Sequence, residues 1–194
     1  MKPNKIVALV GIMALAVLEG WMIFGKHVKQ SDDLSYYQAL SGETEGKASL
    51  SIFGSDYVEC PYELPKLTEL EDYQSVRFNH MAKRIWFFSS RSYVLVVSYD
   101  DYHYATQKAA LEDKYTFCTP GQDEIMTGYA YSMDGFDIQA VEGGWFPKEM
   151  LFLGFNDQNR EIAIVYYYDQ DLDYIDDPLG KFLTEETGWC RVIS

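Results

Sequence analysis

The stretch TGYAYSMDGFDIQAVEGGWFPKEMLFLGFNDQNREIAIVYYY at residues 127–168 carries the clearest fold signal in this chain. Apolar runs of strand length alternate in it with short turn-forming segments, a pattern typical of consecutive antiparallel strands. Asp134 and Gly135 separate the first two runs and suit a type I′ hairpin turn, in which both central residues have φ > 0. GGWFPKE and FNDQNRE supply the next two turns. The stretch therefore predicts a meander of four antiparallel strands.

Further strands precede the meander. SVRFNH at residues 75–80 alternates apolar and polar positions, which predicts a half-buried strand, and RIWFFSS suggests another short one. SYVLVVSY at residues 92–99 contains four consecutive apolar residues, from Val94 to Val97. Such a run is typical of a strand that is covered on both faces, so we expect it to be central in the sheet.

One long helix is predicted after the central strand. Asp100 or Asp101 caps the segment DYHYATQKAALEDKYTF, in which Tyr104, Leu111 and Tyr115 fall on one stripe. A shorter helix is expected between residues 178 and 188. Together with the strands this gives an α+β domain, whose principal helix covers one face of a mainly antiparallel sheet.

The N-terminal stretch from Ile6 to Phe24, IVALVGIMALAVLEGWMIF, predicts a transmembrane helix that would be about 28 Å long in a bilayer core of about 30 Å. A cleaved secretory signal with small residues at Ala14 and Ala16 is the alternative. We favour an uncleaved anchor, because the apolar run continues to Phe24 and Lys26 follows it. The predicted organisation is a signal-anchor at residues 1–25, a juxtamembrane spacer at 26–50 and an acidic α+β domain at 51–194.

The predicted anchor has an orientation in the membrane and contains one acidic residue, Glu19. Lysines flank the apolar stretch on both sides, so the positive-inside rule decides little, and the short N-terminal tail favours a single-pass protein of the cell membrane with an extracytoplasmic domain. Glu19 lies within the apolar stretch. It is expected to stay protonated, to reach towards the headgroups or to face a partner helix.

Charge and cysteine content exclude several classes of protein. With 30 acidic residues against 16 basic ones, the chain has a formal net charge of −14, and no basic stripe is seen outside the N-terminal flank. Nucleic-acid binding is therefore not expected, since it depends on Lys and Arg near phosphates. Cys60, Cys118 and Cys190 show no metal-binding spacing, and either free thiols or one disulfide fit the sequence.

An acidic run at the end of the meander resembles part of a calcium loop. Asp169, Asp171 and Asp173 match the D-x-D-x-D opening of an EF-hand. Tyr174 stands where that loop needs Gly, and Gly180 where it needs Glu, so an EF-hand is excluded. A looser Ca²⁺ site remains an alternative to a solvated strand end, and we expect no cofactor.

Catalytic signatures are missing from the sequence. It contains no G-x-S-x-G elbow, H-E-x-x-H helix, phosphate-binding loop or G-x-G-x-x-G motif. Nothing in the sequence brings His80 or His103 to one of the cysteines. Because the chain has so many Asp and Glu residues, the sequence does not single out any pair of them as a catalytic acid and base.

Tyrosine is the main compositional bias, with 16 residues. Tyrosine is common at binding surfaces, so the strand positions Tyr129, Tyr131, Tyr166 and Tyr168 are candidates to dock a protein or a glycan, although tyrosine also simply favours strands. The sequence thus predicts a membrane-tethered, non-catalytic binding or interaction domain. The alternatives are an enzyme of unrecognised type, such as a hydrolase using acidic residues, and a structural subunit of a membrane complex recruited through the anchor by Glu19.

Overall fold

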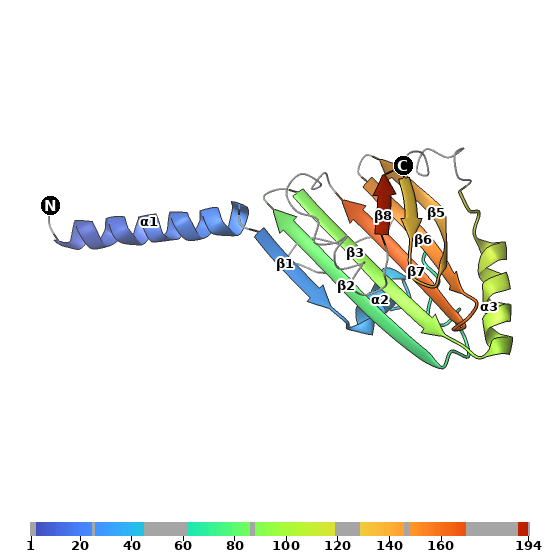
Figure 1. Ribbon diagram of the computed structural model, residues 1–194. Helices are drawn as coiled ribbons and strands as arrows, with labels where there is room; N and C mark the ends of the chain where they lie inside the picture. The colour runs from blue at the N-terminus through green and yellow to red at the C-terminus, as the bar shows by residue number, and fades with distance from the viewer. Residues whose placement is uncertain are drawn as a thin grey trace.

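A computed structural model describes residues 3–24, 26–44, 62–85, 88–118, 129–145, 148–169 and 190–193. A long N-terminal helix, α1 (Pro3–Phe24), projects from a domain built around a twisted sheet (Figure 1). Two shorter helices, α2 (Leu34–Leu40) and α3 (Asp101–Lys114), pack on that domain. The α+β class predicted from the sequence is confirmed.

Six strands form the main sheet, in the order β1-β2-β3-β7-β6-β5, and every neighbouring pair is antiparallel. The strands are β1 (Lys26–Ser31), β2 (Ser75–Ile85), β3 (Phe88–Ser98), β5 (Asp137–Trp145), β6 (Lys148–Asn156) and β7 (Glu161–Asp169). A separate two-stranded ribbon pairs β4 (Tyr129–Ser132) with β8 (Cys190–Ile193).

Strand β3 lies inside the sheet between β2 and β7, as its apolar run predicts. Successive side chains of a strand point to opposite faces. Leu95 and Val97 accordingly join the core beneath the helices, whereas Val94 and Val96 belong to a second core on the opposite face. All four side chains are buried, so the prediction of a strand covered on both faces is confirmed.

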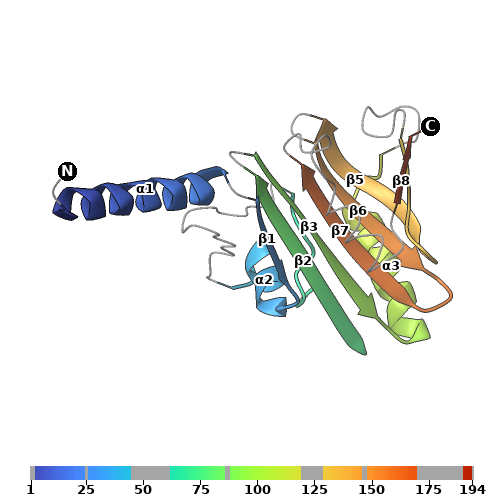
Figure 2. The same cartoon turned by 60° about the vertical axis from the view of Figure 1, so that its left-hand side comes forward.

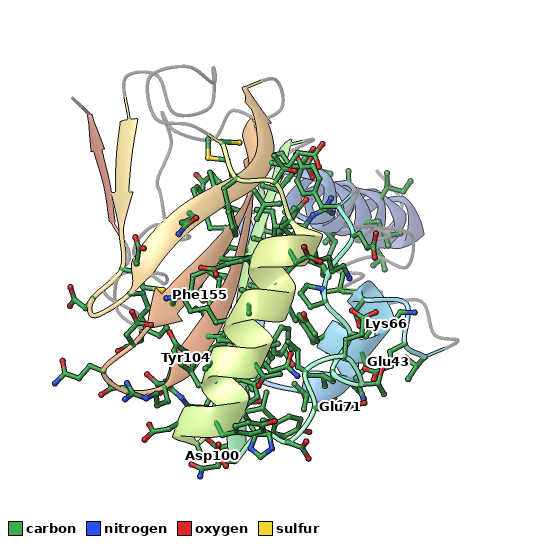
Figure 3. All side chains as sticks on the ribbon, turned by 90° about the vertical axis from the view of Figure 1, so that its right-hand side faces the viewer. Glu43, Lys66, Glu71, Asp100, Tyr104 and Phe155 are labelled. Carbon is green, nitrogen blue, oxygen red and sulfur yellow. The ribbon has the colours of Figure 1, made fainter. Side chains whose placement is uncertain are left out.

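Helix α3 covers one face of the sheet, again as predicted (Figure 3). Asp100 is its N-cap, and its side chain accepts a hydrogen bond from the backbone N–H of His103 at 2.9 Å. Tyr104 and Leu111 are the buried residues of the helix, one above the other on the stripe that the spacing indicates. Helix α2 lies beside β1 and β2 (Figure 2), and its Tyr37 belongs to the same core.

The predicted four-stranded meander is wrong in its first strand. Strands β5, β6 and β7 are consecutive in sequence and lie side by side, but β4 pairs with β8 rather than with β5. The chain does turn at Asp134-Gly135, where the backbone N–H of Phe136 donates to the carbonyl of Met133 at 3.0 Å.

The type of this turn also differs from the prediction. Gly135 has φ +77°, whereas Asp72 and Arg160 are the only non-glycine residues with positive φ in the described part of the chain. Asp134 therefore has negative φ, which fits a type II turn instead of type I′. A type II turn splays the strands it joins, so β4 is free to leave β5 and pair with β8.

The segment predicted to be a spacer at residues 26–50 begins with ordered parts of the domain. Strand β1 pairs with β2 along its whole length, from Lys26 opposite Ile85 to Ser31 opposite His80. Tyr37 of α2 is fully buried, and its hydroxyl donates to the carbonyl of Pro65 at 2.6 Å. A polar, basic strand suits the edge of a sheet, where one side meets water, and this explains why its sequence resembles a linker.

Three further predictions from the sequence concern the N-terminal anchor, a helix near the C-terminus and the cysteines. Across the described residues, no helix has both the length and the apolar character required to cross a membrane, so the predicted transmembrane anchor lacks support. The helix expected between residues 178 and 188 lies outside the described residues. Cys118 is half-buried.

Candidate functional site

Helix α1 presents the largest set of exposed apolar side chains in the described part of the protein. Seven of them are between 55% and 72% exposed. They are Val7, Val10, Ile12, Met13, Leu15, Val17 and Leu18. Residues 11–18 are all exposed, and since an α-helix has about 3.6 residues per turn, this exposure extends around the whole circumference. A helix that is apolar on all sides is normally covered by lipid or by protein.

Tyr166, one of the predicted docking residues, lies in the core. It is fully buried, its ring stacks on Tyr93 with centroids 4.7 Å apart, and Tyr62 meets it edge-on at 6.2 Å. Its hydroxyl donates a hydrogen bond to a carboxylate oxygen of Glu149. Tyr166 therefore helps to hold β7 against β3 and β6 and offers no open face to a partner in this structure.

The other predicted docking residues have different surroundings. Tyr168 is half-buried, and the guanidinium of Arg91 lies 4.5 Å above its ring centroid, within the range of a cation–π interaction. The backbones of Tyr129 and Tyr131 belong to β4, and that of Glu19 belongs to α1. The side chains of these three residues lie outside the described part of the structure.

The described part of the structure does not show the acidic run forming a metal-binding site. Asp169 is the last residue of β7, and Asp171 and Asp173 lie outside the described residues. Where the structure does describe side chains, no group of three His, Cys, Asp or Glu residues is arranged to hold a metal ion. The alternative of a loose Ca²⁺ site thus stays a hypothesis from the sequence.

His103 lies between two carboxylates at the start of α3. Its Nδ1 is 2.8 Å from Oδ2 of Asp100, and its Nε2 is 3.5 Å from Oδ2 of Asp72. Hydrogen bonds from the backbone N–H and then the side chain of His103 hold the pKa of Asp100 below its usual range. Because both ring nitrogens face carboxylates, neither is placed to activate a hydroxyl or thiol nucleophile.

His80 and Cys118, the remaining described candidates for nucleophilic chemistry, are far from each other. His80 is fully buried, with its ring stacked on Tyr36 at a centroid separation of 6.1 Å. The Sγ of Cys118 is 3.5 Å from the carbonyl oxygen of Val141, and Cys118 packs against the core on the opposite face of the sheet from His80. These contacts resemble those of ordinary core residues.

The strand pairing gathers basic residues that the sequence reading missed. Five of them lie on β1 and near the ends of β2 and β3 that are closest to α1. They are Lys26, Lys29, Lys83, Arg84 and Arg91, and we call this set the basic corner. His27 pairs with Arg84, Val28 with Lys83, and Ala82 joins Lys29 to Arg91. Lys26 and Lys29 belong to the N-terminal flank, and the pairing of β1 with β2, which was not foreseen, brings Lys83 and Arg84 beside them.

Part of this arrangement had a signal in the sequence. Lys83, Arg84 and Arg91 flank the apolar residues 85–88, and a hairpin at that point would bring the three together. Nothing in the sequence predicted that these three residues would lie beside Lys26 and Lys29, because an edge strand and a linker are similar in composition.

No protein-family model, curated protein or solved structure matches this chain.

Proposed function

We propose that this protein is a non-catalytic interaction module that α1 holds at a membrane. The exposed apolar surface of α1 is the observation that carries the proposal. Burying a Val, Leu, Ile or Met side chain is worth about 1.5–3 kcal/mol, so seven exposed ones strongly favour an apolar environment. The structure describes side chains for only part of the helix. From Ile6 to Phe24 the sequence has further apolar residues before and after them, and Glu19 is the single charged residue in this stretch.

Lipid fits this surface better than a groove on a partner protein does. A groove covers one stripe of a helix, and the rest of that helix is then polar. Residues 11–18 include no polar side chain on any side of the helix. Acyl chains surround a helix completely and so match an apolar surface that is continuous around it.

The interaction role of the domain is supported by what its candidate groups contact. His103 is held between two carboxylates and His80 lies in the core, which favours binding over catalysis. The strand positions Tyr129 and Tyr131 are the proposed contacts for a protein or glycan.

A flotation experiment tests attachment through α1. The full-length chain is mixed with phosphatidylcholine vesicles and centrifuged through a density gradient at high salt. We expect the wild type to float and the variant Ile12→Lys/Leu15→Lys/Leu18→Lys to lose at least about ten-fold of the floating fraction, because each Lys costs about 2.5 kcal/mol or more in the bilayer centre.

The control variant changes an exposed apolar residue elsewhere. Tyr102 on α3 is 74% exposed, and Tyr102→Lys should float like the wild type. Thermal unfolding of all three proteins checks that the domain remains folded. A wild-type chain that stays at the bottom of the gradient, or a triple variant that still floats, would overturn the proposal.

A further inference from the structure

We propose that the basic corner docks the domain on the anionic headgroups of the membrane that α1 enters. This inference rests on the proposed attachment through α1 and goes beyond it, because it names the surface of the domain that meets the membrane and the lipid chemistry that this surface recognises.

The geometry places the corner beside the end of α1. Helix α1 ends at Phe24 and β1 begins at Lys26, so one residue separates them. Lys26 pairs with Ile85, and Ile85 pairs with Phe88, which closes this end of the β2–β3 hairpin. Both ribbon views show the end of this hairpin next to the C-terminal end of α1 (Figures 1 and 2). A bilayer that surrounds α1 would therefore have its headgroups at the basic corner.

The charge of the corner is opposite to that of the whole protein. Five of the 16 Lys and Arg residues lie there, although the chain has a formal net charge of −14. Residues 26–31, 81–85 and 88–92 contain no Asp or Glu, whereas β7 brings Asp169 opposite Ser90 at the same end of the sheet. The acidic remainder of the domain is repelled by an anionic membrane, so the charge distribution turns the corner towards the headgroups.

Four other described cations already have carboxylate partners. Arg77 contacts Glu161 at 3.4 Å, and Lys114 contacts both Glu63 and Glu69. Lys108 and Arg160 are paired with Asp157 and Asp101. These ion pairs hold the domain together and leave little positive charge for a ligand.

Arg91 differs from those cations. Its guanidinium stacks on Tyr168, and its Nε is buried without a hydrogen-bond partner. A buried donor without an acceptor is costly, and a phosphate oxygen is a strong acceptor for a guanidinium. Ile85 and Phe88 at the hairpin end are residue types that enter the apolar region next to the headgroups.

The test uses the full-length chain with a photocrosslinking residue placed at Ser90. It is reconstituted in vesicles of phosphatidylcholine alone or with about one third phosphatidylglycerol, and lipid crosslinking is measured at low and high salt. We expect crosslinking to increase at least about ten-fold with the anionic lipid and to fall at high salt, because each cation near an anionic surface adds about five-fold in affinity.

Two variants with the same change in charge locate the effect. Lys83→Gln/Arg84→Gln should lose at least about ten-fold of the crosslinking that depends on anionic lipid. Lys66→Gln/Arg77→Gln, which removes two cations outside the corner, should keep it. Equal crosslinking in both kinds of vesicle, equal loss in both variants, or loss caused by inorganic phosphate at constant ionic strength would overturn the proposal.

Flotation of the same samples separates the two proposals. Failure to float on neutral vesicles contradicts attachment through α1. Normal flotation without any effect of the anionic lipid contradicts only docking through the basic corner.

Discussion

Gly135 and Gly42 have nearly the same backbone conformation, with φ +77° and +70°, but different surroundings. A Cβ at Gly135 would lie 3.0 Å from Nδ2 of Asn156, whereas a Cβ at Gly42 would meet nothing within 4 Å. Asn156 is buried, and its Oδ1 accepts hydrogen bonds from the backbone N–H groups of Gln158 and Asn159. Its amide therefore cannot move aside without loss of those bonds.

This pair of glycines separates backbone strain from steric overlap. Gly42→Ala should lower the free energy of unfolding by about 1 kcal/mol through the left-handed backbone alone. Gly135→Ala should lower the free energy of unfolding by about 1 kcal/mol more than Gly42→Ala does, because its Cβ overlaps with Asn156. Gly135→Val should lower it further, because its side chain is larger. Urea denaturation measures all three. If Gly42→Ala and Gly135→Ala shift the midpoint equally, Asn156 does not restrict the turn.

At the scale of elements, α3 is fastened to the loop between β6 and β7 by polar side chains. The hydroxyl of Tyr104 donates to Asp157 at 2.7 Å, and Nζ of Lys108 donates to the same carboxylate oxygen at 2.9 Å. Arg160 reaches Asp101 on the same helix at 2.6 Å. The hydrogen bonds from Tyr104 and then Lys108 hold the pKa of Asp157 below its ordinary value of 3.8.

A lowered pKa makes the contribution of Asp157 depend on pH in one direction. A carboxyl group that is more acidic in the folded state stabilises the protein above its unfolded pKa, and this stabilisation is lost as the pH falls through the folded value. Asp157→Asn should therefore be less stable than the wild type near pH 6, and the difference should shrink below about pH 3.8. Urea denaturation at several pH values measures it. A difference that stays constant down to about pH 2.5 would show that the charge of Asp157 is not involved.

For the molecule as a whole, the folded domain begins before residue 50. Strand β1 completes one edge of the sheet, and Tyr37 fills the core beneath α2, where its ring meets Phe78 edge-on at 5.9 Å. Leu64, Leu67 and Leu70 belong to the same core. A chain that starts after this segment would expose part of the core and an edge of β2.

Shortened chains test this boundary. Residues 26–194 should unfold cooperatively in urea, whereas residues 51–194 should lack a cooperative transition, because loss of a buried Tyr37 alone is comparable to an aromatic-to-Ala change of about 3–5 kcal/mol. Tyr37→Phe in the longer chain is the control, since it keeps the aromatic ring and removes the hydroxyl, whose hydrogen bond to the carbonyl of Pro65 is worth about 1 kcal/mol. Equal stability of both shortened chains would return the boundary to residue 50.

Local features of the fold were predictable from residues that are close in sequence. Alternation identifies β2, the apolar run at Val94 to Val97 identifies a strand covered on both faces, and Asp100 with the composition after it identifies α3. These signals depend on side-chain period and on capping, which are properties of a few neighbouring residues.

Which strands pair was left to the tertiary structure. β4 joins β8 instead of β5, β1 joins β2, and the basic corner exists only because of that second pairing. The period of two likewise predicts that Tyr166 lies in a strand but not that its ring is buried against Tyr93. Strand pairing and face burial depend on the balance of long-range contacts against the entropy of loop closure, and no short stretch of sequence contains that balance.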